Sequence, residues 1–250
     1  MTQKEQLSHE DIVSDILGSV PEEVAVKADF PSRGLFYTPY DPSKPVEIRP
    51  MTFEDERGLS SVKDTRGLKA LEYLVGKCLI NLNPDQLLEM DKLYILMKIR
   101  EISYGSDFRV NITCPECQDV QLISIDIAKL NIDKVPEDLT DPREIFLPVC
   151  KKKASVLFPR ASDYDYLVNV EVAASNMWRF VEHINECSDK KVISDVIGKL
   201  PLRDIHALLE GIGQSQYGID TKFLYKCDTI GCGCETKMEV PFDESFFTMR

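Results

Sequence analysis

Eight cysteines carry the clearest chemistry in this 250-residue sequence, and five of them gather in two short segments. Cys114 and Cys117 form a Cys-x-x-Cys motif, while Cys232 and Cys234 follow Cys227 at offsets of five and seven residues. Two chain turns that each present two thiolates can close the tetrahedral shell that a structural zinc ion prefers. We therefore predict one structural Zn²⁺ with these ligands: Cys114, Cys117, Cys227 and Cys232, with Cys234 as the alternative fourth ligand.

Two other states of these cysteines remain open, a reduced metal-free cluster and a disulfide. A disulfide requires an oxidising compartment, and the N-terminal residues do not have the pattern of a secretory signal. A catalytic zinc would keep one position open for water and typically includes histidine among its ligands. The isolated residues Cys78, Cys150 and Cys187 are expected to be small apolar core residues.

Signals of enzymatic activity are missing from the sequence. The three histidines form no metalloprotease motif, and no nucleophile lies in a recognisable catalytic context. Gly211, Gly213 and Gly218 resemble a glycine-rich loop, but no Lys-Ser or Lys-Thr pair follows them. We therefore expect a protein that is not an enzyme and has no small-molecule substrate.

The charge balance also limits the class of partner. Thirty Lys and Arg residues stand against 42 Asp and Glu residues, which gives a net charge of −12. This charge repels phosphate backbones, so we expect no nucleic-acid partner. The chain has no apolar run of the ~20 residues that a membrane helix needs, so we expect no membrane partner. An apolar content of 43% is sufficient for a packed core.

The first 51 residues contain two candidate interaction segments. Residues 1–23 are predicted to be a leader and linker that contain an amphipathic helix at 8–18, with Ile12 and Ile16 on its apolar stripe. This stripe packs either on a partner or on the chain's own core. Residues 24–51 are rich in proline and alternate like strands, so short β-hairpins are expected there.

A turn at Pro31-Ser32-Arg33-Gly34 is predicted within this hairpin segment, with a positive φ at Gly34. Its Arg33 side chain is expected at an exposed loop tip, where a guanidinium can reach a partner carboxylate. Phe36 and Tyr37 follow the turn and are assigned to the same partner surface. An arginine that binds only its own domain is the alternative.

The remaining chain is predicted to be α+β and to contain two helix-plus-hairpin units. Thr52 and Asp55 should cap the first helix of residues 52–130, which end in a cysteine-tipped hairpin. Residues 131–160 are expected to be connecting strands. Residues 161–250 are expected to contain a long helical stretch over 165–187, two shorter helices, and a second cysteine-tipped hairpin.

The two hairpins form part of an apparent internal repeat. Tyr104-Gly105 and Tyr217-Gly218 each begin a Tyr-Gly-x-Asp pattern, and in both the first tip cysteine comes ten residues after the tyrosine. The two patterns are 113 residues apart, and the same offset aligns Asp91 with Asp204 in the preceding helices. We predict two pseudo-repeated units stacked about a twofold axis, which would bring the cysteine tips together in a zinc-ribbon-like site. Coincidence between two amphipathic helices is the alternative.

Three segments resemble the baseplate hub proteins and hub-assembly chaperones of T-even-like contractile-tailed bacteriophages. They are PSRGLFY at 31–37, VEIRPMTFEDE at 46–56 and SYGSDFRVNITCPEC at 103–117. The resemblance is close over the first half and looser at the terminal hairpin. It implies a non-enzymatic protein made in the host cytoplasm, whose partners are other hub proteins. Its final place would be the virion tail baseplate, or it would act transiently as a chaperone.

Two other functions remain open from the sequence. A zinc-ribbon regulator of nucleic acid or the transcription machinery should carry Lys and Arg around its cysteines, whereas CPECQD and KCDTIGCGCETK are nearly neutral or acidic. A metal-dependent hydrolase would require an open metal position. The sequence makes no prediction of the oligomeric state.

Overall fold

The computed structural model describes residues 8–18, 25–37, 45–61, 68–167, 170–214, 216–242 and 244–247. Helices and strands are mixed along the chain, so the α+β class is confirmed. The predicted linker over residues 19–23 lies outside the described residues. In the described part of the chain, no helix is both long and apolar enough to cross a membrane.

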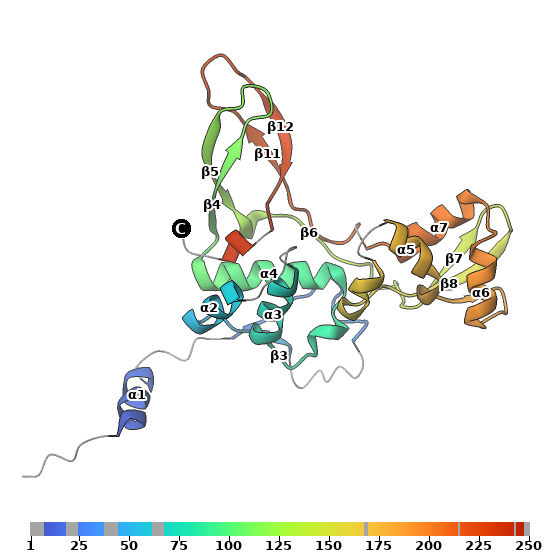
Figure 1. Cartoon of the computed structure of the whole chain (residues 1–250), viewed down its shortest axis with the longest axis horizontal. Helices are drawn as coiled ribbons and strands as arrows, with labels where there is room; N and C mark the ends of the chain where they lie inside the picture. Colours follow the sequence, from blue (N-terminus) through green and yellow to red (C-terminus); the bar gives the residue numbers. More distant parts are fainter. Residues whose placement is uncertain are drawn as a thin grey trace, which may run out of the picture.

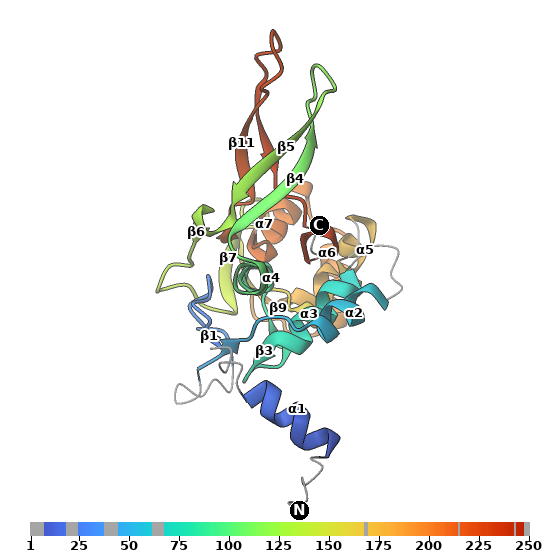
Figure 2. The same cartoon turned by 90° about the vertical axis from the view of Figure 1, so that its left-hand side faces the viewer.

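Helix α1 (His9–Gly18) stands apart from the rest of the molecule (Figures 1 and 2). Its first turn is closed by a reciprocal cap: the Ser8 hydroxyl accepts the Asp11 N–H at 3.1 Å, and the Asp11 carboxylate accepts the Ser8 N–H at 3.0 Å. None of its side chains is buried. The predicted helix is therefore confirmed, and its apolar stripe is exposed.

The first core is built around a small antiparallel sheet and three helices. The sheet has the order β1-β2-β3. Its elements and the neighbouring helices are β1 (Val26–Lys27), β2 (Glu47–Ile48), β3 (Leu79–Ile80), α2 (Phe53–Ser61), α3 (Leu68–Cys78), the 3-10 turn η1 (Pro84–Gln86) and α4 (Glu89–Tyr104). The predicted cap of α2 is present, since the Asp55 carboxylate accepts the Thr52 N–H at 2.8 Å.

The segment after β1 differs from the expected short hairpins. Residues 31–36 form turns rather than a strand, and β1 pairs with the distant β2. The reason lies in α4, where the buried Asp91 accepts the Ser32 N–H at 2.9 Å and holds the turn against the helix. Gly34 has the predicted positive φ, 70°, and Arg33 also adopts a positive φ of 58°.

Helix α4 is the central element of this core and carries the first hairpin. Buried residues lie on all sides of it, as expected of a helix with neighbours all round. The helix ends at Gly105, whose φ of 86° turns the chain directly into β4 (Asp107–Thr113). Strand β5 (Val120–Asp126) pairs with β4 over seven residues, which confirms the first hairpin.

A second core lies at the other end of the molecule (Figure 1). The antiparallel sheet β7-β8-β9 packs there with α6 and α7. The elements are β7 (Arg143–Leu147), β8 (Lys152–Val156), η3 (Ala161–Tyr166), α5 (Val170–Asn176), η4 (Met177–Phe180), β9 (Val181–Ile184), α6 (Lys190–Ile197) and α7 (Leu202–Ile212). Strands β7 and β8, expected only as connectors, thus share a core with the helices that follow.

The helical prediction for residues 165–187 is wrong. Helix α5 covers only seven residues, and the chain then passes through η4 into β9. Val181 and Ile184 are buried in β9, where they complete the sheet beside β8. The stability gained by burying these β-branched residues beside a strand exceeds that of the helix which their spacing in the sequence predicted.

The second hairpin rises beside the first, as both views show (Figures 1 and 2). It consists of β11 (Lys222–Lys226) and β12 (Glu235–Glu239). At the hairpin bases, β10 (Gly218–Ile219) pairs with β6 (Ile132–Asp133), which follows η2 (Ile127–Lys129). The terminal η5 (Glu244–Phe247) places Phe246 against Phe108, with ring centroids 4.6 Å apart.

The positions aligned by the offset of 113 residues share one feature. Asp91 and Asp204 are both fully buried, and each accepts backbone N–H groups from a turn that follows a proline. However, α4 belongs to the first core and α7 to the second. The equivalence of the two units therefore stays a prediction, and these helices do not stack in one core as expected.

Candidate metal centre

The first cysteine tip is a tight turn between β4 and β5. The Cys114 carbonyl accepts the Gln118 N–H at 3.0 Å, and the Cys114 N–H bonds to the Asp119 carbonyl at 2.8 Å. Gln118 adopts a φ of 61°, which reverses the chain after Cys117. The geometry turns both thiols of the motif toward the neighbouring hairpin.

The second tip is longer and looser. The Cys227 N–H donates to the Cys234 carbonyl at 2.9 Å, which closes the base of the loop. Gly231 and Gly233 have φ values of 84° and 65°, a conformation that glycine adopts without steric cost. These two glycines bend the loop so that Cys232 lies opposite the first tip.

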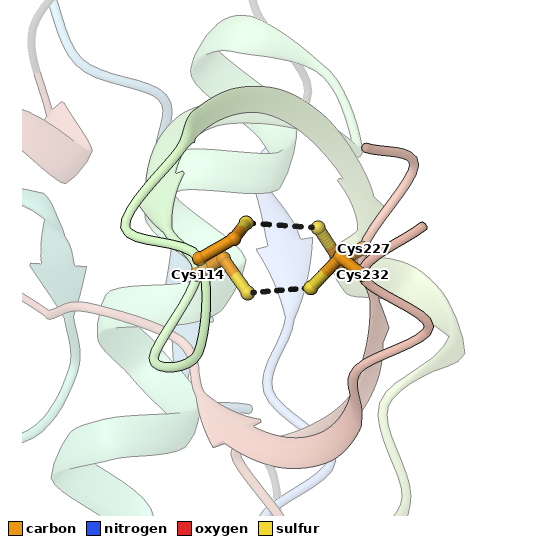
Figure 3. A group of neighbouring side chains, drawn as sticks. Cys114, Cys227 and Cys232 are labelled. Carbon is orange, nitrogen blue, oxygen red and sulfur yellow. Dashed lines mark hydrogen bonds between the residues drawn. The ribbon is translucent and has the colours of Figure 1, made fainter. Parts of the chain in front are cut away.

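The four predicted ligands lie together. The Sγ atoms of Cys114, Cys117, Cys227 and Cys232 are all within 4.8 Å of one another. Each of the two closest pairs joins the hairpins: Cys114 to Cys232 and Cys117 to Cys227, both at 3.7 Å (Figure 3). Zn–S bonds of about 2.3 Å give a tetrahedron with edges of about 3.8 Å. A disulfide needs about 2.0 Å, and all four residues are free thiols.

Cys234, the alternative fourth ligand, is not a member of this group. It is 6% exposed and lies at the loop base, where its carbonyl pairs with Cys227. The geometry thus favours Cys232 over Cys234.

Two of the four thiols ionise easily in this environment. The backbone N–H of Cys117 hydrogen-bonds to Cys114 and lowers its pKa, although burial acts in the opposite direction. Hydrogen bonds from Thr229, against opposing burial, lower the pKa of Cys227 to about 6. The surroundings therefore lower the pKa of one cysteine on each hairpin.

The pKa of Cys232 moves in the opposite direction. The backbone N–H of Cys234 lowers it, but burial and the neighbouring sulfur atoms outweigh this bond and raise the pKa to about 12. The neighbouring sulfur atoms therefore oppose deprotonation of Cys232. A divalent cation removes this opposition because its charge stabilises all four thiolates at once. The donor set fits a metal that prefers sulfur and a closed tetrahedral shell, as zinc does.

A small apolar core and several polar contacts hold the hairpin tips together. The small core between the hairpins contains the cysteines with Ile112 and Tyr225. Isolated two-stranded hairpins are only marginally stable in water. A metal bound to sulfur atoms from both hairpins would therefore supply much of the stability of this end of the molecule.

The residues assigned to a partner surface lie in different environments. Arg33 donates to the Val135 carbonyl at 2.9 Å and pairs with Glu137 at 3.1 Å, so its guanidinium is engaged within the chain. Phe36 is half-buried against Phe158. Tyr37 is a core residue rather than a surface contact: it is 3% exposed.

The buried position of Tyr37 has a clear cause. Its hydroxyl donates to the carboxylate of Asp91 and accepts the Leu88 N–H at 3.0 Å. Ile12 and Ile16, in contrast, are exposed at 45% and 60% on α1. The structure therefore does not bring the five assigned residues into one surface.

The sequence analysis missed a polar cluster beside the cysteines. Gln121 and Asp119 of the first hairpin hydrogen-bond with Thr229 and other residues of the second. Gln121 and the buried Ile125 are four residues apart in β5, so strand periodicity places both on the same, inner face. That spacing in the sequence could have predicted that Gln121 faces the second hairpin.

A comparison with protein-family models identifies this fold's relatives. Residues 36–248 match the model described as T4 bacteriophage base plate protein. The chain belongs to this family. The resemblance seen in the sequence is thereby confirmed at the level of a T4-like phage baseplate protein. Searches of curated proteins and of solved structures found no match.

The match to the base plate family includes both cysteine tips, the second core, and the first core from residue 36 onward. Helix α1 and the turn at residues 31–34 lie before its first residue. Proteins of this family generally have structural rather than enzymatic roles, and their partners are other baseplate proteins. The four cysteines therefore belong to the part of the chain that carries the family fold.

Proposed function

We propose that this chain is a non-enzymatic component or assembly chaperone of the central hub of the baseplate. In this role it binds other hub proteins, and a structural Zn²⁺ holds its two hairpins together. The observation that carries the proposal is the base plate family match over residues 36–248. The protein would be made in the host cytoplasm and act there or remain in the virion tail.

The cysteine geometry supports a structural metal rather than a catalytic one. Four sulfur atoms at tetrahedral spacing fill the coordination shell, which leaves no position for water or a substrate. A hydrolase would need an open position beside a general base. The metal's proposed role is therefore to fix the shape of a surface that other proteins contact.

The charges at the tips favour a protein partner over nucleic acid. Residues 114–121 and 227–234 contain no Lys or Arg. The exposed charged residues there are Glu116, Asp119 and Asp228, which repel phosphate. A nucleic-acid regulator built on this site would need the opposite charge pattern.

Helix α1 is the proposed contact with a hub partner. It has ten residues and no buried side chain, and a helix this short is only marginally stable alone in water. Docking of Ile12 and Ile16 in an apolar groove of a partner would stabilise it. Arg33 and Phe36 would contribute a second contact only if Arg33 exchanged Glu137 for a partner carboxylate.

Co-purification with the other proteins of the same phage's baseplate hub tests this function. Three forms are compared: the intact chain, a chain lacking residues 1–20, and the double variant Ile12→Ser with Ile16→Ser. Leu202→Ser is the matched control, because Leu202 is 84% exposed on α7. We expect the intact chain and the control to retain a hub protein, and the two altered chains to lose it with unchanged melting temperatures.

Two results would count against the proposal. Failure of the intact chain to associate with any hub protein would refute the hub function. Normal association with a lowered melting temperature after deletion would show that α1 belongs to the chain's own fold.

A further inference from the structure

We propose that Gln121 is a positioning residue that fixes the second cysteine tip for metal binding. It lies on β5 of the first hairpin, whereas Cys227 and Cys232 belong to the second. The inference rests on the proposed zinc site and deepens it, because it states how two separate hairpins reach one coordination geometry.

All four hydrogen-bond partners of the Gln121 side chain lie on the opposite hairpin. Its Nε2 donates to Cys227 Sγ at 3.4 Å and to Thr229 Oγ1 at 2.9 Å. Its Oε1 accepts the Tyr225 hydroxyl at 3.0 Å and the Asp228 N–H at 3.1 Å. One amide therefore holds the ligand Cys227 and the two residues that follow it.

The orientation of this amide is set by its partners. The Asp228 backbone N–H can only donate, so the amide oxygen must face it. The amide nitrogen consequently faces Cys227 as a donor. A donor aimed at this sulfur fixes the orientation of the ligand, as hydrogen-bond partners of metal ligands do.

A second contact between the hairpins fixes Thr229. Its hydroxyl accepts from Gln121 and donates to Asp119 at 2.7 Å. Asp119 also closes the first tip through its carbonyl bond to the Cys114 N–H. The two tips are thus joined by polar contacts that do not involve a metal.

The asymmetry of the tips explains why only one needs such support. The first tip is closed by its own backbone bonds within five residues. The second tip contains two glycines with positive φ between Cys227 and Cys234, so its loop can adopt more conformations than the first tip. Holding Cys227 in place lowers the entropy lost when the metal binds.

Metal affinity of the full chain tests the role of Gln121. The variant Gln121→Met keeps the side-chain size and removes all four hydrogen bonds, and Gln121→Glu removes the donor to Cys227. Gln118→Met is the matched control, because Gln118 is exposed on the same hairpin and, among the described residues, its side chain bonds to the Pro115 carbonyl alone. Zn²⁺ affinity is measured by competition with a chromophoric chelator, and Co²⁺ reports the sulfur coordination by its absorption.

We expect both Gln121 variants to bind Zn²⁺ about 10- to 100-fold more weakly at unchanged stoichiometry, the usual cost of removing a partner of a metal ligand. The Gln118 control should match the wild type. Equal affinity of Gln121→Met and the wild type would overturn the proposal.

A second measurement separates this inference from the zinc proposal. If the wild type binds no Zn²⁺, the zinc site fails, and the contacts of Gln121 are then tested in the metal-free chain. Hydrogen exchange of the Asp228 amide should be faster in Gln121→Met than in the wild type and in Gln118→Met. Unchanged exchange would show that Gln121 does not position the second tip.

Discussion

Replacing Asp55 with alanine should destabilise the first core. The Asp55 carboxylate accepts hydrogen bonds from the Thr52 N–H at 2.8 Å and from the Arg49 guanidinium at 2.7 and 3.1 Å. Its side chain is 6% exposed. The substitution therefore removes the carboxylate half of the reciprocal α2 cap and leaves Arg49 without this carboxylate. The Thr52 hydroxyl can still accept the N–H of residue 55.

Two estimates bound the magnitude, and both include the bond from Thr52. Loss of a helix cap costs about 0.5–2 kcal/mol. Burial opposes ionisation of Asp55, but the bonds from Arg49 and Thr52 outweigh it and lower the pKa from 3.8 to about 2. That difference corresponds to at most about 2.4 kcal/mol. Because Arg49 is 31% exposed to screening solvent, we take about 1–2 kcal/mol for Asp55→Ala.

The contribution of Asp55 also depends on pH. Its pKa is lower in the folded chain than in the unfolded chain, so the stabilisation is complete above about pH 4 and is lost as the pH falls toward about 2. Urea unfolding, followed by circular dichroism, measures this for the wild type and Asp55→Ala. Glu54→Ala is the control, because Glu54 is exposed in the same helical turn. A stability difference at pH 7 equal to that of the control, or one that persists unchanged at pH 2, would refute the reasoning.

Two further predictions concern the packing of the cores. A Cβ at Gly211 would lie 3.1 Å from side-chain atoms of Ile145 and Val156, whereas one at Gly76 would meet no atom within 4 Å. Calorimetry should therefore find Gly211→Ala about 2 kcal/mol less stable than Gly76→Ala. Equal stabilities would contradict the packing of α7. Tyr37→Phe removes a donor to a buried carboxylate and should cost about 1–3 kcal/mol while hub association is retained. Loss of hub association with unchanged stability would instead show that Tyr37 contacts a partner.

Local sequence chemistry predicted much of the fold. The hairpins of residues 107–126 and 222–239 follow from strand alternation around turn residues and cysteines. The caps formed by Ser8 with Asp11 and by Thr52 with Asp55 act over three residues. Such features depend on near neighbours in the chain, so the sequence displays them directly.

Features that depend on distant neighbours were not predictable in the same way. Val181 joins a sheet because β8 offers it a partner strand, a fact that the helical spacing of residues 165–187 does not contain. Tyr37 is buried because its hydroxyl donates a hydrogen bond to Asp91, which lies 54 residues further along the chain. The convergence of the cysteines was predicted from a spacing typical of metal ligands and from the apparent repeat of the two hairpins.

Native mass spectrometry of the intact chain tests the central claim, that a structural zinc joins the two hairpins. We predict one Zn²⁺ in the wild type and in Cys234→Ser, and none in Cys232→Ser, whose melting temperature should match that of the chelated wild type. A metal-free wild-type chain, with a melting temperature that does not change on chelation, would contradict the account.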